Sequence, residues 1–291
     1  YNRDEILAIL ALAAELKDMK RRGDAHPLLK GKTLGMVFEK SSTRTRVSFE
    51  VGMYDLGGSA LFLSGKDLQI GRGEPIEDTA RVLSRYLDGI MIRTFEQKKV
   101  ETLAQYAAIP VINGLTDFAH PCQVMADLLT IQEHKGELNG RTLCYVGDGN
   151  NMANSLIVGG IKTGMNVRVA CPAGNRPDAG IMAWAAKNGN FACTPDVPEM
   201  ARGADVLYTD VWASMGQEDE AAQRREIFAG YQINQAVLRV AAPGAMVLHC
   251  LPAHREEEIT AAVFEAHANE IFDQAENRLH AQKAIMVHLM R

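Results

Sequence analysis

Residues 33–63 read TLGMVFEKSSTRTRVSFEVGMYDLGGSALFL, and this stretch decides the fold. Residues 33–38 are an apolar run of strand length, a helical pattern extends from about 46 to 56, and residues 60–63 are a second, shorter apolar run. Two strands that are joined by a helix form the parallel strand–helix–strand unit. The stretch therefore predicts an α/β fold built on a parallel sheet.

The same alternation of strands and helices continues along the rest of the chain. We expect helices over 4–21, 76–86, 99–107, 123–134, 155–163, 178–188, 197–202, 233–240 and 275–290, and strands over 89–92, 110–113, 143–146, 167–170, 206–209 and 245–248. The alternation pauses at 136–141 and then restarts. Two successive series of about four strands each predict two parallel-sheet α/β domains, residues 1–135 and 136–274. The last helix, within 275–291, is expected to pack back on the first domain.

The composition is that of an ordinary globular protein. Among 291 residues, 47% are hydrophobic and 23% are charged, and 36 acidic residues against 31 basic ones give a net charge of -5. An acidic chain without a basic tract is a poor candidate for binding nucleic acid or an anionic membrane. The longest apolar stretch, around residues 6–16, is interrupted by Glu15 and is too short to span a bilayer. By the same net charge, the chain is expected to show no preference for an anionic substrate.

Cysteine usage predicts a reducing compartment. The five cysteines are odd in number and widely scattered, with no C-x-x-C pair and no zinc-type spacing. They are Cys122, Cys144, Cys171, Cys193 and Cys250. We expect free thiols in the cytoplasm, with no metal site, and we treat all of them except Cys250 as structural.

A cluster of hydroxyls and cations separates the first predicted strand from its helix. Residues 40–46 read KSSTRTR. The N–H groups at a helix N-terminus bind phosphate, Ser and Thr add hydroxyl donors, and Arg offers a bidentate fork. An ordinary helix cap explains Ser42 or Thr43 alone, but not three hydroxyls interleaved with two arginines. We therefore predict an anion site here.

Two other strand-to-helix junctions carry polar side chains. In residues 120–123, HPCQ, the His could polarise a carbonyl and the Gln could bind an amide, although a simple turn with Pro in the first helical turn fits equally well. Residues 147–152, GDGNNM, lack the third Gly of a dinucleotide fingerprint, and no acidic residue follows the next strand. We expect no nucleotide cofactor, but Asn151 and its neighbour Asn150 remain available for a small polar ligand.

Two later strands end in chemically useful residues. Asp210 and Ser214 follow the strand at 206–209 and could converge on an amino group, or they could simply close a capped turn. Cys250 follows the strand at 245–248, where parallel sheets place reactive groups, although a lone Cys is more often a buried thiol. The chain has no G-x-x-x-x-G-K-[ST], H-E-x-x-H or G-x-S-x-G motif, which disfavours kinases, zinc proteases and α/β-hydrolases.

Taken together, these motifs resemble the aspartate/ornithine carbamoyltransferase family over practically the whole chain. The motifs that carry the resemblance are, in order, 42–46 (STRTR), 69–74 (QIGRGE), 91–94 (MIRT), 120–123 (HPCQ), 147–151 (GDGNN), Asp210 with 214–216 (SMG), 249–252 (HCLP) and 276–278 (ENR). Eight motifs in register are specific, although none would be so alone. The resemblance implies transfer of the carbamoyl group of carbamoyl phosphate to the δ-amino group of L-ornithine, without a cofactor or a metal ion.

The resemblance also implies which residues act. The implied carbamoyl-phosphate site consists of Ser42, Thr43, Arg44, Thr45, Gln69, Arg93, His120, Gln123, Cys250, Leu251 and Arg278. The implied ornithine site consists of Asn151, Asp210, Ser214 and Met215. Catalytic roles would fall to Arg44, Arg93, His120, Asp210, Cys250 and Arg278. Gln69 would be lent by a neighbouring subunit, so a homotrimer or a multiple of trimers is expected.

Within the family, acceptors other than ornithine are the nearest alternatives. An enzyme acting on aspartate would present H-P-L-P and a lysine-bearing loop, whereas this chain has Cys250 and the pair of Asp210 and Ser214. An enzyme acting on putrescine would not need the carboxylate contacts expected of residues 214–216. A catalytically silent binding protein with this fold is a third alternative, weakened because every expected reactive position is filled. One departure is Glu256, the first of three glutamates, where many relatives carry Gly; we interpret it as a surface variation.

Overall fold

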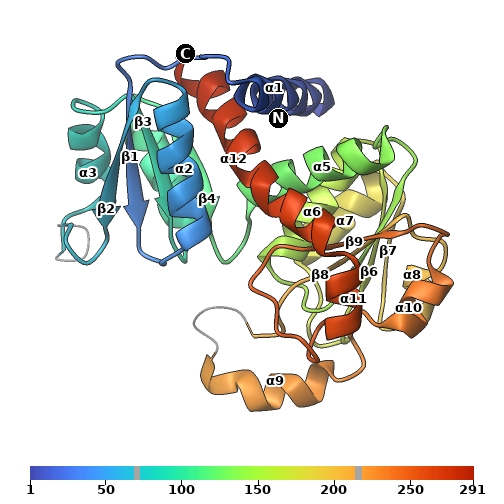
Figure 1. Cartoon of the computed structure of the whole chain (residues 1–291). Coiled ribbons are helices and arrows are strands. Elements are labelled where there is room, and N and C mark those ends of the chain that lie inside the picture. The colour runs from blue at the N-terminus through green and yellow to red at the C-terminus, as the bar shows by residue number, and fades with distance from the viewer. Residues whose placement is uncertain (69–72, 214–217) are drawn as a thin grey trace. The chain divides into compact units, whose positions relative to one another are not determined.

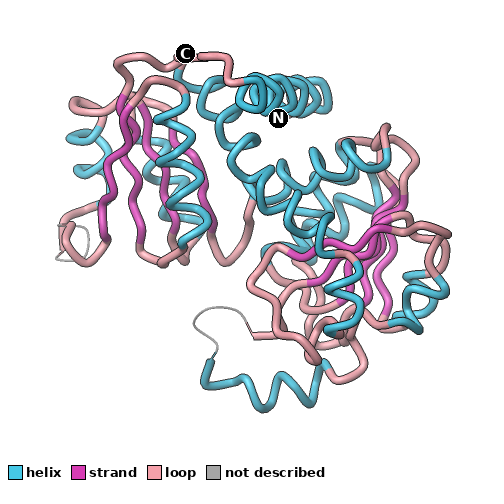
Figure 2. Tube along the Cα trace, in the orientation of Figure 1, coloured by secondary structure: helices cyan, strands magenta, loops and turns pink. Residues whose placement is uncertain are grey.

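The computed structural model describes residues 1–68, 73–213 and 218–291, and these residues form two compact units. The first unit comprises Arg3–Ala126 and Glu276–Arg291, and the second comprises Asp127–Ala275. The boundaries fall inside two helices, α5 (Pro121–Lys135) and α12 (Ala268–Met290). Each unit contains one parallel sheet, which Figure 2 shows as a set of strands running side by side. The prediction of two parallel-sheet α/β domains is therefore confirmed.

The first unit is built on a four-stranded sheet in the order β2-β1-β3-β4. Its elements are α1 (Arg3–Arg22), β1 (Thr33–Phe38), α2 (Thr43–Asp55), β2 (Ser59–Ser64), α3 (Ile76–Leu83), β3 (Gly89–Arg93), α4 (Gln97–Tyr106) and β4 (Val111–Leu115), with the first part of α5 and most of α12. All neighbouring strands pair in parallel. The strand–helix–strand unit at 33–63 is thus β1, α2 and β2.

Helices cover both faces of this sheet, as a parallel sheet requires. On one face, α3 and α4 pack through Ala80 and Leu103 against Ile90 and Ile92. On the other face, α2 and α12 approach each other closely, because an ideal Cβ on Gly52 would lie 2.8 Å from Met286 Cε. The residues of α12 from Glu276 onward therefore pack within the first unit, as the sequence predicted.

The second unit is built on a five-stranded sheet in the order β7-β6-β5-β8-β9. Its elements are β5 (Thr142–Val146), α6 (Asn151–Lys162), β6 (Asn166–Ala170), α7 (Ala179–Asn188), β7 (Phe191–Thr194), α8 (Val197–Ala201), β8 (Val206–Thr209), a 3₁₀ turn (Glu218–Glu220), α9 (Ala221–Phe228), α10 (Gln235–Val240), β9 (Met246–His249) and α11 (Ala261–Ala266). A core under one face joins Cys144 and Val247 of the sheet to α8, α10 and α11 (Figure 1).

Four expectations about the elements were wrong in detail. The second sheet has a fifth strand, β7, which is short, lies at the edge and is only partly buried, so its apolar signal is weak. The last helix begins at Ala268 rather than 275, and α9 and α11 were not expected. Helices α2, α5 and α6 begin two to four residues earlier than the apolar periodicity suggests. Their first turns contain polar candidate site residues, Arg44, Gln123 and Asn151, which interrupt the apolar periodicity.

Most of the predicted motifs lie at or just after the carboxyl end of a strand; among the described residues, the motif at 276–278 is an exception and lies within α12. Arg93 is the last residue of β3, residues 116–120 follow β4, and the turn at 147–150 follows β5. Asp210 and Cys250 follow β8 and β9 directly. Parallel α/β sheets bind ligands at this edge, because the loops there are flanked by helix N-termini. Within the described part of the chain, no helix has the length and apolarity needed to cross a membrane.

Candidate active site

The N-terminus of α2 holds the predicted anion motif. Ser42 is the N-cap: its Oγ accepts a hydrogen bond from the backbone N–H of Thr45 at 3.2 Å and donates to Thr45 Oγ1 at 3.2 Å. The capping interpretation is therefore correct for Ser42, but it does not account for Thr43 and Arg44, which begin the helix. A helix N-terminus with an adjacent guanidinium is a site for a phosphate group.

A buried guanidinium links this motif to a distant helix. Arg278, in α12, donates from Nη1 to Gln123 Oε1 at 2.7 Å and from Nη2 to Thr45 Oγ1 at 3.1 Å. All three side chains are buried. Hydrogen bonds between residues 155 and 233 positions apart bring α2, α5 and α12 together within the first unit. The side chain of Arg278 is thereby held in one orientation before any ligand binds.

His120 lies among cations and is buried. Its pKa is lowered well below the usual value near 6.5, first by burial and then by the positive charges of Arg278, Arg93 and Arg44. A buried imidazole is kept neutral by these two causes. Arg278, Arg93 and Arg44 therefore all lie within electrostatic range of His120 in the first unit. A neutral His120 can donate a hydrogen bond to a carbonyl oxygen, while the arginines attract an anion.

The neutral state of His120 predicts a pH dependence of stability. In the unfolded chain this His binds a proton below about pH 6.5, whereas the folded protein binds it only at a lower pH. The unfolded state therefore binds more protons as the pH falls, and the free energy of unfolding should decrease by up to about 1.4 kcal/mol per pH unit below about pH 6.5. Urea unfolding between pH 5 and pH 8 checks this, with His120→Gln as the comparison. Equal slopes in the two proteins would contradict the prediction.

Lys17, in α1, supports the turn of α12 that carries Arg278. Its Nζ donates to Asn277 Oδ1 at 2.7 Å, and both side chains are buried. We expect Lys17→Met to raise the KM for carbamoyl phosphate about tenfold, because a lost charge-assisted hydrogen bond releases the residue next to Arg278. Lys20→Met is the matched control, since Lys20 lies in the same helix but pairs with Asp55 at the surface. A lower melting temperature with unchanged KM would leave Lys17 with a merely structural role.

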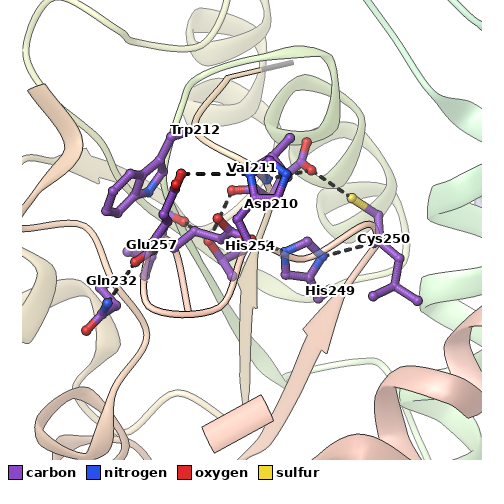
Figure 3. A network of polar contacts seen from close by, with 12 residues as sticks. Asp210, Val211, Trp212, Gln232, His249, Cys250, His254 and Glu257 are labelled. Atoms are coloured by element: carbon purple, nitrogen blue, oxygen red, sulfur yellow. Dashed lines mark hydrogen bonds and ion pairs between the residues drawn. The ribbon is translucent and has the colours of Figure 1, made fainter. Parts of the chain in front are cut away.

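In the second unit, Asp210 is the centre of a polar network. Its Oδ1 accepts hydrogen bonds from Cys250 Sγ at 3.0 Å and from the backbone N–H of Val211 at 2.8 Å, and its Oδ2 accepts from Asn150 Nδ2 at 3.0 Å. Figure 3 shows the thiol of Cys250 directed at this carboxylate. The structure therefore brings together Asp210 and Cys250, which the sequence predicted separately. A carboxylate beside a thiol can hold an amino group and accommodate its proton.

The loop after β9 is organised by a fully buried pair, His249 and Glu258. His249 Nε2 contacts Glu258 Oε1 at 2.9 Å, and the backbone N–H of Leu251 donates to His249 Nδ1 at 2.9 Å. Because Nδ1 accepts, the ring proton lies on Nε2 and is donated to Glu258. Leu251 has a φ of 59°, in the left-handed region, and the loop holds it there. The pair thus positions Cys250 and Leu251.

The sequence of the three glutamates at 256–258 did not predict that one of them pairs with His249 in the loop after β9. Glu256 is exposed, as expected, but its φ is 69°, a conformation that favours glycine. Glu258, two residues later, is completely buried. Buried and exposed side chains follow no regular spacing in a short loop, so no sequence signal distinguished Glu258 from its neighbours.

The turn before α6 carries Asn151, a residue of the expected acceptor site, and its neighbour Asn150. Asn150 is the N-cap of α6 and accepts hydrogen bonds from the backbone N–H groups of Met152 and Ala153. The same side chain donates to Asp210, so it fixes both the helix start and the carboxylate. Asn151 is the first residue of the helix. The structure therefore adds Asn150 to the predicted set as a residue that orients Asp210.

Three predicted residues, Gln69, Ser214 and Met215, lie outside the described residues. The others fall into two groups. Those in the first unit are Ser42, Thr43, Arg44, Thr45, Arg93, His120, Gln123 and Arg278, and those in the second unit are Asn151, Asp210, Cys250 and Leu251. The assignment of Cys250 and Leu251 to the carbamoyl-phosphate site stays a prediction.

One group of side chains in the described ranges has the spacing of metal ligands. His254, Glu257 and Glu258 offer ligand atoms within 4.8 Å of one another. The carboxylates already have protein partners, however: Glu257 pairs with Arg225 at 2.9 Å, and Glu258 accepts from His249 and from the backbone N–H of His254. We therefore assign no metal to this group.

Comparison with protein families and known proteins finds similarity over the whole chain. Residues 1–133 match the carbamoyl-P binding domain of the aspartate/ornithine carbamoyltransferase family, and residues 139–289 match its Asp/Orn binding domain. An ornithine carbamoyltransferase of Syntrophotalea carbinolica is 59% identical over all of this chain and 96% of its own length. An anabolic ornithine carbamoyltransferase of Pyrococcus furiosus is 53% identical over all of this chain and 94% of its own. The solved structure of ornithine carbamoyltransferase from Pyrococcus furiosus has a TM-score of 0.95, with coverage of 100% and 94%.

Proposed function

The chain belongs to the aspartate/ornithine carbamoyltransferase family, and from this premise we propose that it transfers the carbamoyl group of carbamoyl phosphate to the δ-amino group of L-ornithine. The products are L-citrulline and phosphate. The observation that carries the choice of acceptor is the carboxylate of Asp210 with Cys250 and Asn150 on its oxygens. A carboxylate here attracts the amino groups of ornithine and repels the second carboxylate of aspartate.

The donor site consists of the cationic residues of the first unit. The N-terminus of α2, with Arg44 and Arg93, binds the phosphate group and stabilises the charge that develops on it as it leaves. His120, Thr45 and Arg278 donate hydrogen bonds to the carbamoyl oxygen, which becomes an oxyanion during attack. The hydrogen bonds of Arg278 with Gln123 and Thr45 hold its guanidinium for this role.

The acceptor must lose a proton before it attacks. An amine with a Lys-like pKa near 10.4 is mostly protonated at pH 7, so the site has to favour the neutral form. Asp210 and Cys250, whose side chains are 3.0 Å apart, are the groups that accommodate this proton. Asp210 with Ser214 binds the α-amino group, while Asn151 and the Met215 backbone bind the carboxylate. Attack by the amine on the carbamoyl carbon then expels phosphate, and no covalent enzyme intermediate forms.

Several finer assignments belong to the same proposal. Residues 1–135 with 275–291 bind carbamoyl phosphate, and residues 136–274 bind ornithine. The change from one family match to the other between residues 133 and 139 supports the first boundary, and the inclusion of 276–291 in the first unit supports the second. The enzyme works as a homotrimer or a multiple of trimers, with Gln69 lent by a neighbouring subunit. A cytoplasmic location is supported by the five free cysteines. The Pyrococcus furiosus relative named anabolic supports a role in arginine biosynthesis.

An assay of carbamoyl transfer with three acceptors tests the proposal. The protein is incubated with carbamoyl phosphate and ornithine, aspartate or putrescine in parallel, and each carbamoylated product is quantified. We expect citrulline from ornithine and little product from the other two. Carbamoylation of aspartate alone, or of none of the three acceptors, would refute the proposal. Equal activity with putrescine would show that the acceptor carboxylate is not bound.

A further inference from the structure

Two cysteines that the sequence separates by 22 positions lie in contact in the second unit. Cys171 directly follows β6, and Cys193 lies in β7, the edge strand of the sheet. Their Sγ atoms are 3.6 Å apart. The register pairs Val169 with Cys193, and Cys171 is two residues beyond Val169, so both thiols lie on the same face of the sheet. No motif contains this pair, because the two residues meet only through strand pairing.

The two thiols differ in environment and in acidity. Cys171 is 1% exposed, whereas Cys193 is only partly buried. The hydrogen bond between them, opposed by burial and assisted by the charge of Arg176, lowers the pKa of Cys193 to about 7. The same hydrogen bond, with burial, raises the pKa of Cys171. The accessible thiol is therefore the nucleophile, since the thiolate is the reactive form, and the buried thiol stands next to it.

We propose that Cys171 and Cys193 form an oxidative modification site that closes into an intrachain disulfide on reaction with a small disulfide compound. The Cys193 thiolate attacks one sulfur of the compound, forms a mixed disulfide and releases one thiolate. Cys171 then loses its proton and attacks Cys193 Sγ, which releases the second thiolate. Two cysteine thiols are oxidised and one disulfide compound is reduced to two thiols, so electrons and atoms balance.

The first step prepares the second. The largest cause that raises the pKa of Cys171 is its hydrogen bond with Cys193. Once Cys193 is in a mixed disulfide, no thiolate remains to accept that hydrogen bond, and Cys171 ionises more readily. Its Sγ already lies 3.6 Å from the sulfur that it attacks. Ring closure is therefore favoured over a lasting adduct.

The segment after Cys171 connects the pair to the acceptor residues. The backbone N–H of Gly149 donates to Asn175 O at 2.9 Å, and Asn175 Nδ2 donates to Asp148 Oδ1 at 3.4 Å. The contact is tight, since an ideal Cβ on Gly149 would lie 2.2 Å from the carbonyl carbon of Arg176. A disulfide requires the two sulfurs to approach to about 2.05 Å, which moves the end of β6. We expect this shift to reach the 147–150 turn and to raise the KM for the acceptor about threefold to tenfold.

Mapping of the disulfide tests the modification site without relying on the proposed activity. The full-length protein is treated with oxidised glutathione and digested, and its peptides are analysed by mass spectrometry. The protein that has both cysteines should lose about 2 Da and give a peptide pair linked through Cys171 and Cys193. Cys171→Ser should instead keep a glutathione adduct of about 305 Da on Cys193, and Cys193→Ser should carry neither product. If Cys193 kept a lasting glutathione adduct in the protein that has both cysteines, or did not react at all, the proposal would be overturned.

Kinetics of the oxidised protein test whether the disulfide affects the turn at 147–150. The KM for ornithine is measured before oxidation, after it, and after reduction with dithiothreitol, with Cys193→Ser as the control for oxidation elsewhere. The KM should rise on oxidation and return on reduction only in the protein with both cysteines. Binding of carbamoyl phosphate, measured by calorimetry, should not change. An oxidised protein with an unchanged acceptor KM would overturn the connection, and absence of any transfer activity would instead count against the proposed function.

Discussion

Arg44→Ala is expected to reduce kcat/KM for carbamoyl phosphate by about 100- to 1,000-fold, the effect of losing one preorganised charged donor. Arg44 lies in the first turn of α2, beside the Ser42 cap, and its charge is felt by His120. Its guanidinium contributes to binding of the phosphate and to stabilisation of the leaving group. The fold should not change, because the residue is only half-buried. Calorimetric titration and steady-state kinetics measure the loss, and circular dichroism checks the fold.

Arg46→Ala is the matched control for Arg44. Arg46 lies two residues further along the same helix, but its Nε pairs with Glu50 Oε1 at 3.0 Å and its guanidinium stacks on Phe62, with Cζ 3.9 Å from the ring centroid. Its removal should change kcat/KM by less than about threefold, since an exposed ion pair contributes little. Comparable losses in both variants, or intact binding of carbamoyl phosphate in Arg44→Ala, would show that Arg44 is not the main anion ligand.

Asp210→Asn is expected to lower kcat/KM for ornithine by about 100-fold or more, within the range of groups that handle protons in transfer reactions. The amide keeps the shape of the side chain, so the hydrogen bonds from Val211 and Asn150 can persist in part. What disappears is the charge that binds the α-amino group and assists loss of a proton from the δ-amino group. Binding of carbamoyl phosphate should stay unchanged, because Asp210 belongs to the second unit and the donor residues belong to the first.

Asp205→Asn provides the control at the opposite end of the same strand. Asp205 precedes β8 and contacts Arg141 at 3.1 Å and the backbone N–H of Thr142 at 2.8 Å, so it has a structural role. Its replacement should lower the melting temperature slightly and leave kcat/KM for ornithine within about twofold, as expected for a site away from the chemistry. An Asp210→Asn protein with near-normal acceptor kinetics would remove Asp210 from the mechanism.

Much of the fold was predictable because burial leaves a periodic record. The strands β1, β3, β5 and β8 are buried on both faces and appear as continuous apolar runs. The edge strand β7 left no such run, since only part of its surface is covered. The first turns of α2, α5 and α6 were assigned to loops for a related reason. They contain polar candidate site residues among the apolar ones, and these interrupt the apolar periodicity.

The sequence predicted the candidate site residues that lie in motifs, but not the residues that support them. Arg44, His120 and Asp210 were identified because they follow strands within short motifs. Lys17 and Glu258 were not, because each acts through a partner on another part of the chain: Lys17 through Asn277, 260 positions away, and Glu258 through a loop without periodicity. A supporting residue has no motif of its own, because a side chain from any part of the chain can support the site if it reaches its partner residue.

By itself, the sequence determined the two parallel-sheet domains, the order of their main elements and the residues that could carry the chemistry. It was misleading in one respect, since a net charge of -5 suggested no preference for anions. Only the tertiary structure placed Arg44, Arg93 and Arg278 around His120, and only strand pairing brought Cys171 to Cys193. The physical reason is one of range. Apolar periodicity and turn chemistry act between near neighbours, whereas electrostatic and thiol chemistry depends on distances of a few ångströms between residues that the chain separates widely.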